Sequence, residues 1–295
     1  MSSSTAPISS DLLWPNGQYE LLDFGHGRKL EAFAGRVLDR PCPAADTVAP
    51  RHPQLWHTAD LRIAPSPVRT AGISASGPWP HWRIAVSDQV QMQLRVTSFG
   101  HVGLFPEQHA NWRRIDHLVR HFPEGGARVL NLFAYTGAAT LIAAAAGAQE
   151  VVHVDASRPT VRWARENADA SGLAHTPIRW IVDDVRKFVA REIRRERRYD
   201  LIVLDPPTFG HGSSGKRWEI VRDLWPLLAD CTRLLTCRAE SRLVFSAHCE
   251  EPTVEEIGTW LARSCGPIEA SGRMVLGDRQ GRTLDAGFFA IARRR

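Results

Sequence analysis

The fold of this chain is decided by Arg128-Val129-Leu130-Asn131-Leu132-Phe133-Ala134-Tyr135-Thr136-Gly137, a short apolar run that ends in a glycine. An alanine-rich segment, 138–146, follows at once, so the pattern predicts a strand over 128–135, a tight turn and a helix over 138–147. In open α/β sheets a ligand binds where such a strand passes into its helix. The turn holds one glycine instead of the three of a dinucleotide fingerprint, which favours a nucleoside ligand without phosphates.

An acidic residue ends the next apolar run, 151–154. Asp155 lies about eighteen residues after Gly137, close to the spacing expected of a carboxylate that binds the ribose hydroxyls. The alternative is a helix N-cap for the segment that follows. With the one-glycine turn, Asp155 points to S-adenosylmethionine on a doubly wound sheet, and Ala156 is counted with the same site.

Two adjacent acids, Asp183-Asp184, end the third strand of the pattern. One of them is a candidate to accept a hydrogen bond from the exocyclic amine of adenine, and Asp184 is favoured. A helix N-cap is again the structural alternative.

The fourth strand passes into Asp205-Pro206-Pro207-Thr208-Phe209. Two prolines after a buried apolar run stop the strand and stiffen its exit. A stiff exit suits a site that holds a flat base at a fixed distance from a reactive methyl group. Asp205 is placed to accept from a base amine or to face the cofactor, and Phe209 is placed to stack on a base. The alternative is a structural loop.

Two basic segments are weaker candidates for RNA contact. The loop 210–217 is small and basic, and the run 191–198 is rich in arginine. A solvated surface loop explains the first equally well. For the arginine run an exposed helix end is favoured over RNA contact, because cations suit a helix C-terminus.

Composition sets broad limits. The chain has 295 residues with 43% hydrophobic content, which is enough for one sizeable core and a small extra domain. Its net charge of +5 makes it mildly basic. The five cysteines show no C-x-x-C pair, so a disulfide framework and a zinc site are not expected. No apolar run approaches the length of a membrane span, and the start is no secretory signal. We therefore expect a cytoplasmic protein without metal or membrane contact, and the sequence leaves its oligomeric state open.

Three segments are expected along the chain. Residues 1–16 are predicted to be a disordered tail. Residues 17–99 are predicted to be a small, mainly β domain that begins with a β-hairpin, whose first strand enters a glycine-bounded turn over 19–27 and whose second strand spans 30–38. Residues 100–295 are predicted to form an α/β domain, because strands and helices alternate from 127 onward. Two strands near the end, at about 272–277 and 286–293, are predicted to form an antiparallel hairpin at the edge of a mostly parallel, Rossmann-like seven-stranded sheet.

The motifs Asn131-Leu132-Phe133-Ala134-Tyr135-Thr136-Gly137 and Asp205-Pro206-Pro207-Thr208-Phe209, together with Asp155 and Asp184, resemble those of class I S-adenosylmethionine-dependent methyltransferases. Within this class the chain resembles the subgroup that modifies bacterial large-subunit ribosomal RNA. The resemblance implies cofactor contacts at Phe133, Tyr135, Thr136, Gly137, Asp155, Asp184 and Asp205, and Asn131 of the same motif is counted with the cofactor site. It also implies that the segment 105–108 lies beside the cofactor, with Gln108 as the candidate.

Several activities fit this resemblance. The first is methylation of a ring or exocyclic nitrogen of an RNA base. The second is methylation of a small molecule or protein, because no separate RNA-binding module is apparent. Relatives that methylate a cytosine carbon use a cysteine after the fifth strand, but Cys249 is shifted by a few residues from that place, so we expect no covalent adduct. A non-catalytic RNA-binding scaffold and a nicotinamide-dependent oxidoreductase are further alternatives, the last disfavoured by the single glycine.

Overall fold

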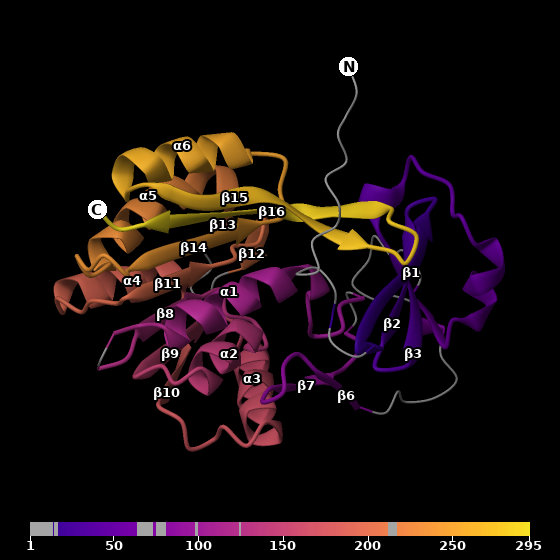
Figure 1. Cartoon of the computed structure of the whole chain (residues 1–295), viewed down its shortest axis with the longest axis horizontal. Coiled ribbons are helices and arrows are strands. Elements are labelled where there is room, and N and C mark those ends of the chain that lie inside the picture. Colours follow the sequence, from indigo (N-terminus) through magenta and orange to yellow (C-terminus); the bar gives the residue numbers. More distant parts are fainter. Residues whose placement is uncertain are drawn as a thin grey trace. The chain divides into compact units, whose positions relative to one another are not determined.

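The computed structural model describes residues 14, 17–63, 73–74, 81–97, 100–123, 125–211 and 217–295 (Figure 1). The predicted tail over 1–16 lies outside these ranges apart from Trp14, and so does most of the loop over 210–217. The chain divides into two compact units, one of residues 1–110 with 275–286, the other of residues 111–274 with 287–295. A catalytic domain that begins near residue 100 remains our proposal.

The first unit is built from short strands. Its five-stranded sheet has the order β1 (Tyr19–Gly25), β2 (Arg28–Phe33), β3 (Arg36–Pro41), β4 (Leu61–Ile63), β5 (Ile73–Ser74), and a separate ladder joins β6 (Trp82–Ala85) to β7 (Gln91–Leu94). The predicted hairpin is confirmed as β1 and β2, which pair antiparallel. The single strand predicted over 30–38 is wrong: Ala34 and Gly35 both have positive φ and turn the chain between β2 and β3.

A buried carboxylate anchors this first unit. The Asp23 side chain is fully buried and forms an ion pair with Arg282. It also accepts hydrogen bonds from the Trp56 indole N–H (2.9 Å) and the His52 backbone N–H (2.8 Å). Burial alone acts to raise the pKa of Asp23, but these donors outweigh it and lower the pKa to about 2. A buried charge with so many donors is compensated and holds the surrounding segments together.

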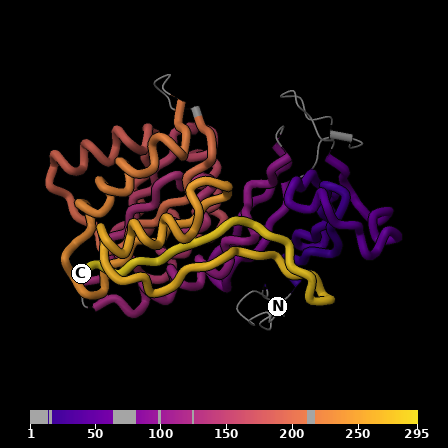
Figure 2. The backbone as a smooth tube through the Cα atoms, turned by 90° about the horizontal axis from the view of Figure 1, so that it is seen from above, coloured from indigo at the N-terminus to yellow at the C-terminus, as the bar shows by residue number. Residues whose placement is uncertain are grey.

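The second unit contains the predicted seven-stranded sheet. Its order is β10 (Ile178–Val182), β9 (Glu150–Asp155), β8 (Arg128–Leu132), β11 (Leu201–Leu204), β14 (Arg242–Ala247), β16 (Thr283–Arg293), β15 (Ile268–Gly277). The pairs from β10 to β14 are parallel, whereas β16 runs antiparallel to β14. Figure 2 follows the two long yellow strands β15 and β16 to the turn that joins them. Because β8 lies between β9 and β11, the strand order reverses at β8, and its carboxyl end is the switch point where ligands bind in such sheets.

Helices cover both faces of this sheet (Figure 1). One face packs against α4 (Val185–Arg194), α5 (Ile220–Leu234) and α6 (Val254–Ser264), and the other carries α1 (His109–Arg120), α2 (Ala138–Ala145) and α3 (Arg158–Ala170). The alternation of β8 explains this: Leu130 and Leu132 join the apolar core that contains Phe188 of α4, whereas Asn131 between them bonds to Thr140 of α2. Among the described helices, none is long and apolar enough to cross a membrane.

Candidate cofactor and substrate site

The turn after β8 has an unusual backbone. Phe133, Tyr135 and Gly137 all have positive φ, at 55°, 50° and 93°. The left-handed region is expected of glycine but rare for aromatic residues, and such outliers gather at functional sites. Two hydrogen bonds hold the turn in place: Ala134 N–H donates to the Val154 carbonyl (3.1 Å), and Tyr135 N–H donates to Asp155 Oδ2 (2.9 Å). Strand β9 therefore fixes the strained turn.

Asp155 ends β9 beside this turn. Besides Tyr135, its carboxylate accepts a hydrogen bond from the Ser157 N–H (2.8 Å). The cap of α3 is Ser157, whose side chain accepts from Thr160 N–H, so the alternative that Asp155 caps this helix is wrong. Burial raises the pKa of the Asp155 carboxyl against the opposing effect of its two backbone donors. The carboxylate oxygens have lone pairs beyond these two bonds, and these free acceptor sites suit the O–H donors of a ribose.

A buried polar chain supports the turn from below. Asn131 Nδ2 donates to Thr140 Oγ1 (2.9 Å), and Thr140 Oγ1 lies 2.9 Å from His153 Nδ1. Burial lowers the pKa of His153 to about 3, so the imidazole is neutral at physiological pH. The Asn131 amide is thus bonded inside the protein. This geometry favours a role for Asn131 in supporting the turn over its predicted contact with the cofactor.

The turn also packs closely on α3. The Asn167 side-chain amide donates to the Thr136 carbonyl (2.9 Å), and Thr136 is almost fully buried. A Cβ on Gly137 would lie 3.1 Å from the Ala164 Cβ, tighter than nearly all such contacts. Glycine is therefore required here for both its left-handed φ and the approach of α3.

The two acids after β10 have local partners. Asp184 is the N-cap of α4, with its side chain accepting from the N–H groups of Arg186 and Lys187. Burial acts to raise the pKa of Asp184, but hydrogen bonds and the charge of the Arg186 guanidinium hold it below its usual range. Asp183 is less buried and forms an ion pair with Arg191 (2.8 Å). The helix cap weighed for Asp184 is thus present, and adenine contact by either acid remains a prediction.

The exit of β11 is fixed to the neighbouring strand. Asp205 Oδ1 accepts a hydrogen bond from Ser246 Oγ (2.8 Å), at the end of β14, and Thr208 Oγ1 donates to the His248 carbonyl (2.9 Å). Phe209 follows with 65% of its surface exposed, the most exposed large hydrophobic residue among those described. Because β11 pairs with β8, Asp205 leaves the sheet at the edge where the strained turn begins. The exit therefore presents a fixed carboxylate and an exposed ring.

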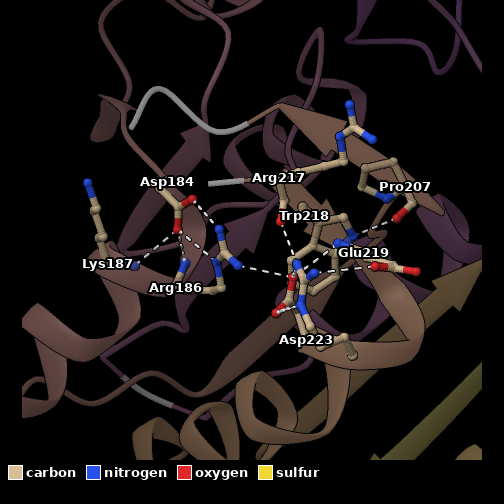
Figure 3. A network of polar contacts seen from close by, with 9 residues as sticks. Asp184, Arg186, Lys187, Pro207, Arg217, Trp218, Glu219 and Asp223 are labelled. Carbon is tan, nitrogen blue, oxygen red and sulfur yellow. Dashed lines mark hydrogen bonds and ion pairs between the residues drawn. The ribbon is translucent and has the colours of Figure 1, made fainter. Parts of the chain in front are cut away.

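A short hairpin continues from this exit and was not predicted. Strands β12 (Phe209–His211) and β13 (Arg217–Glu219) pair antiparallel. Buried Trp218 of β13 donates its indole N–H to the Pro207 carbonyl (2.6 Å; Figure 3). Its ring lies against the Phe133 ring, with 4.9 Å between ring centroids. The only signal in the sequence was an aromatic residue in an otherwise polar segment, which is too short to show a strand period.

Gln108 and Cys249 are the remaining residues that the sequence brought into consideration. Gln108 is buried at the end of a 3₁₀ turn (Pro106–Gln108) in the first unit, and its cofactor contact stays a prediction. Cys249 is half-buried, with its Sγ 3.7 Å from the Pro252 carbonyl. Burial raises the pKa of the Cys249 thiol to about 11, against the opposing charge of Arg273.

Comparisons with known proteins agree with this arrangement. The family model of S-adenosylmethionine-dependent methyltransferases matches residues 46–260. A crystal structure of the SAM-dependent methyltransferase from Agrobacterium tumefaciens is 33% identical with a TM-score of 0.86, covering 95% of this chain and 91% of that one. The structure of SMU.776, a methyltransferase complexed with SAH, has a TM-score of 0.70 at 17% identity over 93% of this chain and 75% of that one, which supports the fold alone.

Curated relatives match a shorter region. Ribosomal RNA large subunit methyltransferase K/L from Vibrio cholerae is 34% identical over 161 residues, and the protein of that name from Shewanella baltica is 36% identical over 160. Each match covers 53% of this chain and 21% of the relative, so the chain spans about a fifth of their length. The family model, the sheet order and the strained one-glycine turn agree: the chain belongs to the S-adenosylmethionine-dependent methyltransferases.

Proposed function

We propose that the enzyme methylates a base nitrogen of RNA and that ribosomal RNA is the substrate class. The observation that carries this proposal is the exit of β11, where fixed Asp205 is followed by exposed Phe209. The curated relatives named as ribosomal RNA methyltransferases support it, although the chain matches only part of each. An RNA substrate of this class also implies that the enzyme acts in the cytoplasm.

The cofactor half of the site is assigned to the turn and the neighbouring strand ends. Bound S-adenosylmethionine supplies a methyl group on a positively charged sulfur, which makes that carbon electrophilic. In this proposal Asp155 binds the ribose hydroxyls, and the turn residues Phe133, Tyr135 and Gly137 form the wall beside it. The two acids after β10 lie at the end of the strand next to β9, on the side where adenine is expected.

The substrate half is assigned to the exit of β11. Phe209 stacks on the incoming base, a contact of about 1–3 kcal/mol in single-strand recognition. Asp205 accepts a hydrogen bond from an exocyclic amine. This bond directs the lone pair of the amine nitrogen at the methyl carbon. A ring nitrogen attacks with a lone pair of its own and needs no strong base. As the bond from nitrogen to the methyl carbon forms and the bond from sulfur to that carbon breaks, the positive charge passes from sulfur to nitrogen and neutral S-adenosylhomocysteine leaves; an exocyclic amine then gives a proton to Asp205 or to water. No charge is created in the transfer, so alignment in a dry site supplies most of the rate enhancement.

The properties of Cys249 favour nitrogen over carbon as the target. Methylation of a cytosine carbon requires a thiolate to add to the ring first. With a pKa of about 11, the Cys249 thiol is ionised to only about one part in ten thousand at pH 7. The side chain is also half-buried and directed at the Pro252 carbonyl. We therefore assign no covalent intermediate to this enzyme.

A labelled methyl group tests the proposal. The enzyme is incubated with cofactor that carries a tritiated methyl, and with total RNA, total protein or a metabolite extract in parallel. We expect label in ribosomal RNA, and digestion to nucleosides should place it on a base nitrogen. Label in protein or metabolites alone, with none in RNA, would instead establish the second activity considered from the sequence. Label on a cytosine carbon would refute the assignment of the methylated atom.

A further inference from the structure

Trp218 contacts three parts of the site at once. Its indole N–H donates to the Pro207 carbonyl at the exit of β11 (2.6 Å). Its ring lies 4.9 Å from the Phe133 ring in the strained turn, and the Arg186 guanidinium of α4 lies 5.8 Å from the centre of the indole. The side chain is only 4% exposed. One buried indole thus joins the turn on the cofactor side to the exit on the substrate side.

Arg186 extends this connection to the end of β10 (Figure 3). Its guanidinium donates to Asp184 Oδ2 (2.9 Å) and to Asp223 Oδ2 (3.0 Å). Asp223, on α5, in turn accepts a hydrogen bond from the Glu219 N–H at the end of β13 (3.0 Å). Strand β13 is therefore held at two adjacent residues: at Trp218 by the indole, and at Glu219 by a network of charged side chains that begins at the cap of α4.

The strand pairing explains what this anchoring controls. In the hairpin Trp218 pairs with Gly210, and Glu219 pairs with Phe209. Neighbouring residues of a strand point to opposite faces, so the buried Trp218 and the exposed Phe209 belong to opposite faces of the hairpin. Any shift of Trp218 away from Pro207 therefore moves Phe209 relative to Asp205.

We propose that Trp218 is a positioning residue for methyl transfer: by holding the hairpin against the Pro207 carbonyl, it fixes Phe209 at a set distance from Asp205 and the cofactor turn. This inference rests on the proposed function, in which Phe209 receives the substrate base. Trp218 touches neither substrate nor cofactor in this proposal. Its effect therefore falls on alignment of the base and not on cofactor affinity.

Two variants isolate the indole hydrogen bond. Trp218→Phe keeps an aromatic ring but removes the donor to Pro207, and replacement of Trp218 by benzothienylalanine keeps the full shape without an N–H. Trp225→Phe is the matched control, because Trp225 is a half-buried tryptophan of α5 whose ring packs against Trp260, with 6.0 Å between centroids. Each protein is examined for binding of S-adenosylhomocysteine, for amide hydrogen exchange over 207–211 and 217–220, and for single-turnover methylation of ribosomal RNA.

We expect both Trp218 variants to bind S-adenosylhomocysteine within about twofold of wild type and to lose about tenfold or more in single-turnover rate, because one buried orienting hydrogen bond is lost. Exchange over both segments should rise, whereas Trp225→Phe should match wild type in every measurement. The inference would be overturned if amide exchange in both Trp218 variants were as slow as in wild type, or if exchange rose equally in Trp225→Phe. If wild-type enzyme methylates no RNA, the proposed function fails, and the exchange measurement still decides whether Trp218 positions the hairpin.

Discussion

Replacing Asp155 with alanine separates the two tasks that the structure gives this carboxylate. It accepts from the backbone of Tyr135 and so holds a residue whose φ is 50°, and in our proposal it also binds the ribose. Lost ribose hydrogen bonds weaken binding by about 1–3 kcal/mol. Without its anchor the turn relaxes from the left-handed conformation, and restoring that conformation on binding costs about 1–2 kcal/mol more.

The sum, about 2–5 kcal/mol, corresponds to a loss of about thirtyfold to several thousandfold in affinity for S-adenosylhomocysteine. Titration calorimetry measures this loss directly. Asp169→Ala is the control, because Asp169 is an exposed acid on the neighbouring helix α3 and carries the same charge. Affinity of Asp155→Ala within twofold of wild type would refute the reasoning, and so would an equal loss in Asp169→Ala. Asp155→Asn, which keeps one acceptor oxygen, should fall between wild type and Asp155→Ala.

Three other changes test separate parts of the molecule. Asp205→Ala should lower the single-turnover rate by about a hundredfold while cofactor affinity stays near wild type, because its contact is with the reacting base; a rate near wild type would leave Asp205 as a structural residue. Cys249→Ser should keep most of the methyl transfer, and a trapped adduct on RNA that contains 5-fluorocytosine would contradict the absence of a covalent step. Asp23→Asn should lower the free energy of unfolding by about 2 kcal/mol near neutral pH, since the pKa of Asp23 is lowered to about 2 in the folded chain. In the wild type this stabilisation is complete above about pH 4 and disappears as the pH falls through about 2. Urea denaturation should therefore show a difference in unfolding free energy between the two proteins at pH 7, and this difference should vanish below about pH 2.

The repeated strand and helix pattern allowed the sheet to be predicted from the sequence, because each apolar run and each amphipathic segment is visible locally. Strand ends were less accurate. The run predicted to extend to Tyr135 ends at Leu132, since Phe133 already has positive φ. At the edge of the sheet, β15 begins at Ile268, earlier than expected, because the first half of this strand is half-exposed and lacks an apolar period.

The parts of the site that escaped prediction depend on contacts between distant residues. Arg186 and Asp223 meet across 37 positions of sequence, and Ser246 reaches Asp205 across 41. No local sequence pattern predicts such pairs. The helix cap formed by Asp184 could be considered from the sequence because a cap depends on neighbouring residues. Whether Asp184 caps the helix or binds a ligand depends instead on the direction of the Arg186 side chain, which the sequence does not show.

The division of the chain into units has a consequence for any attempt to exchange modules within this family. The first unit is discontinuous: residues 275–286 belong to it, although almost the whole catalytic sheet precedes them in sequence. Its buried Asp23 is paired with Arg282 from this short segment. A cut after residue 110 would thus separate Asp23 from Arg282 and leave the buried Asp23 carboxylate without its cationic partner, whereas Arg282 would keep its ion pair with Asp278. A transplanted amino-terminal module requires three junctions, one near residue 110 and two more on either side of the tip of the hairpin β15–β16, so the two pieces must be replaced together.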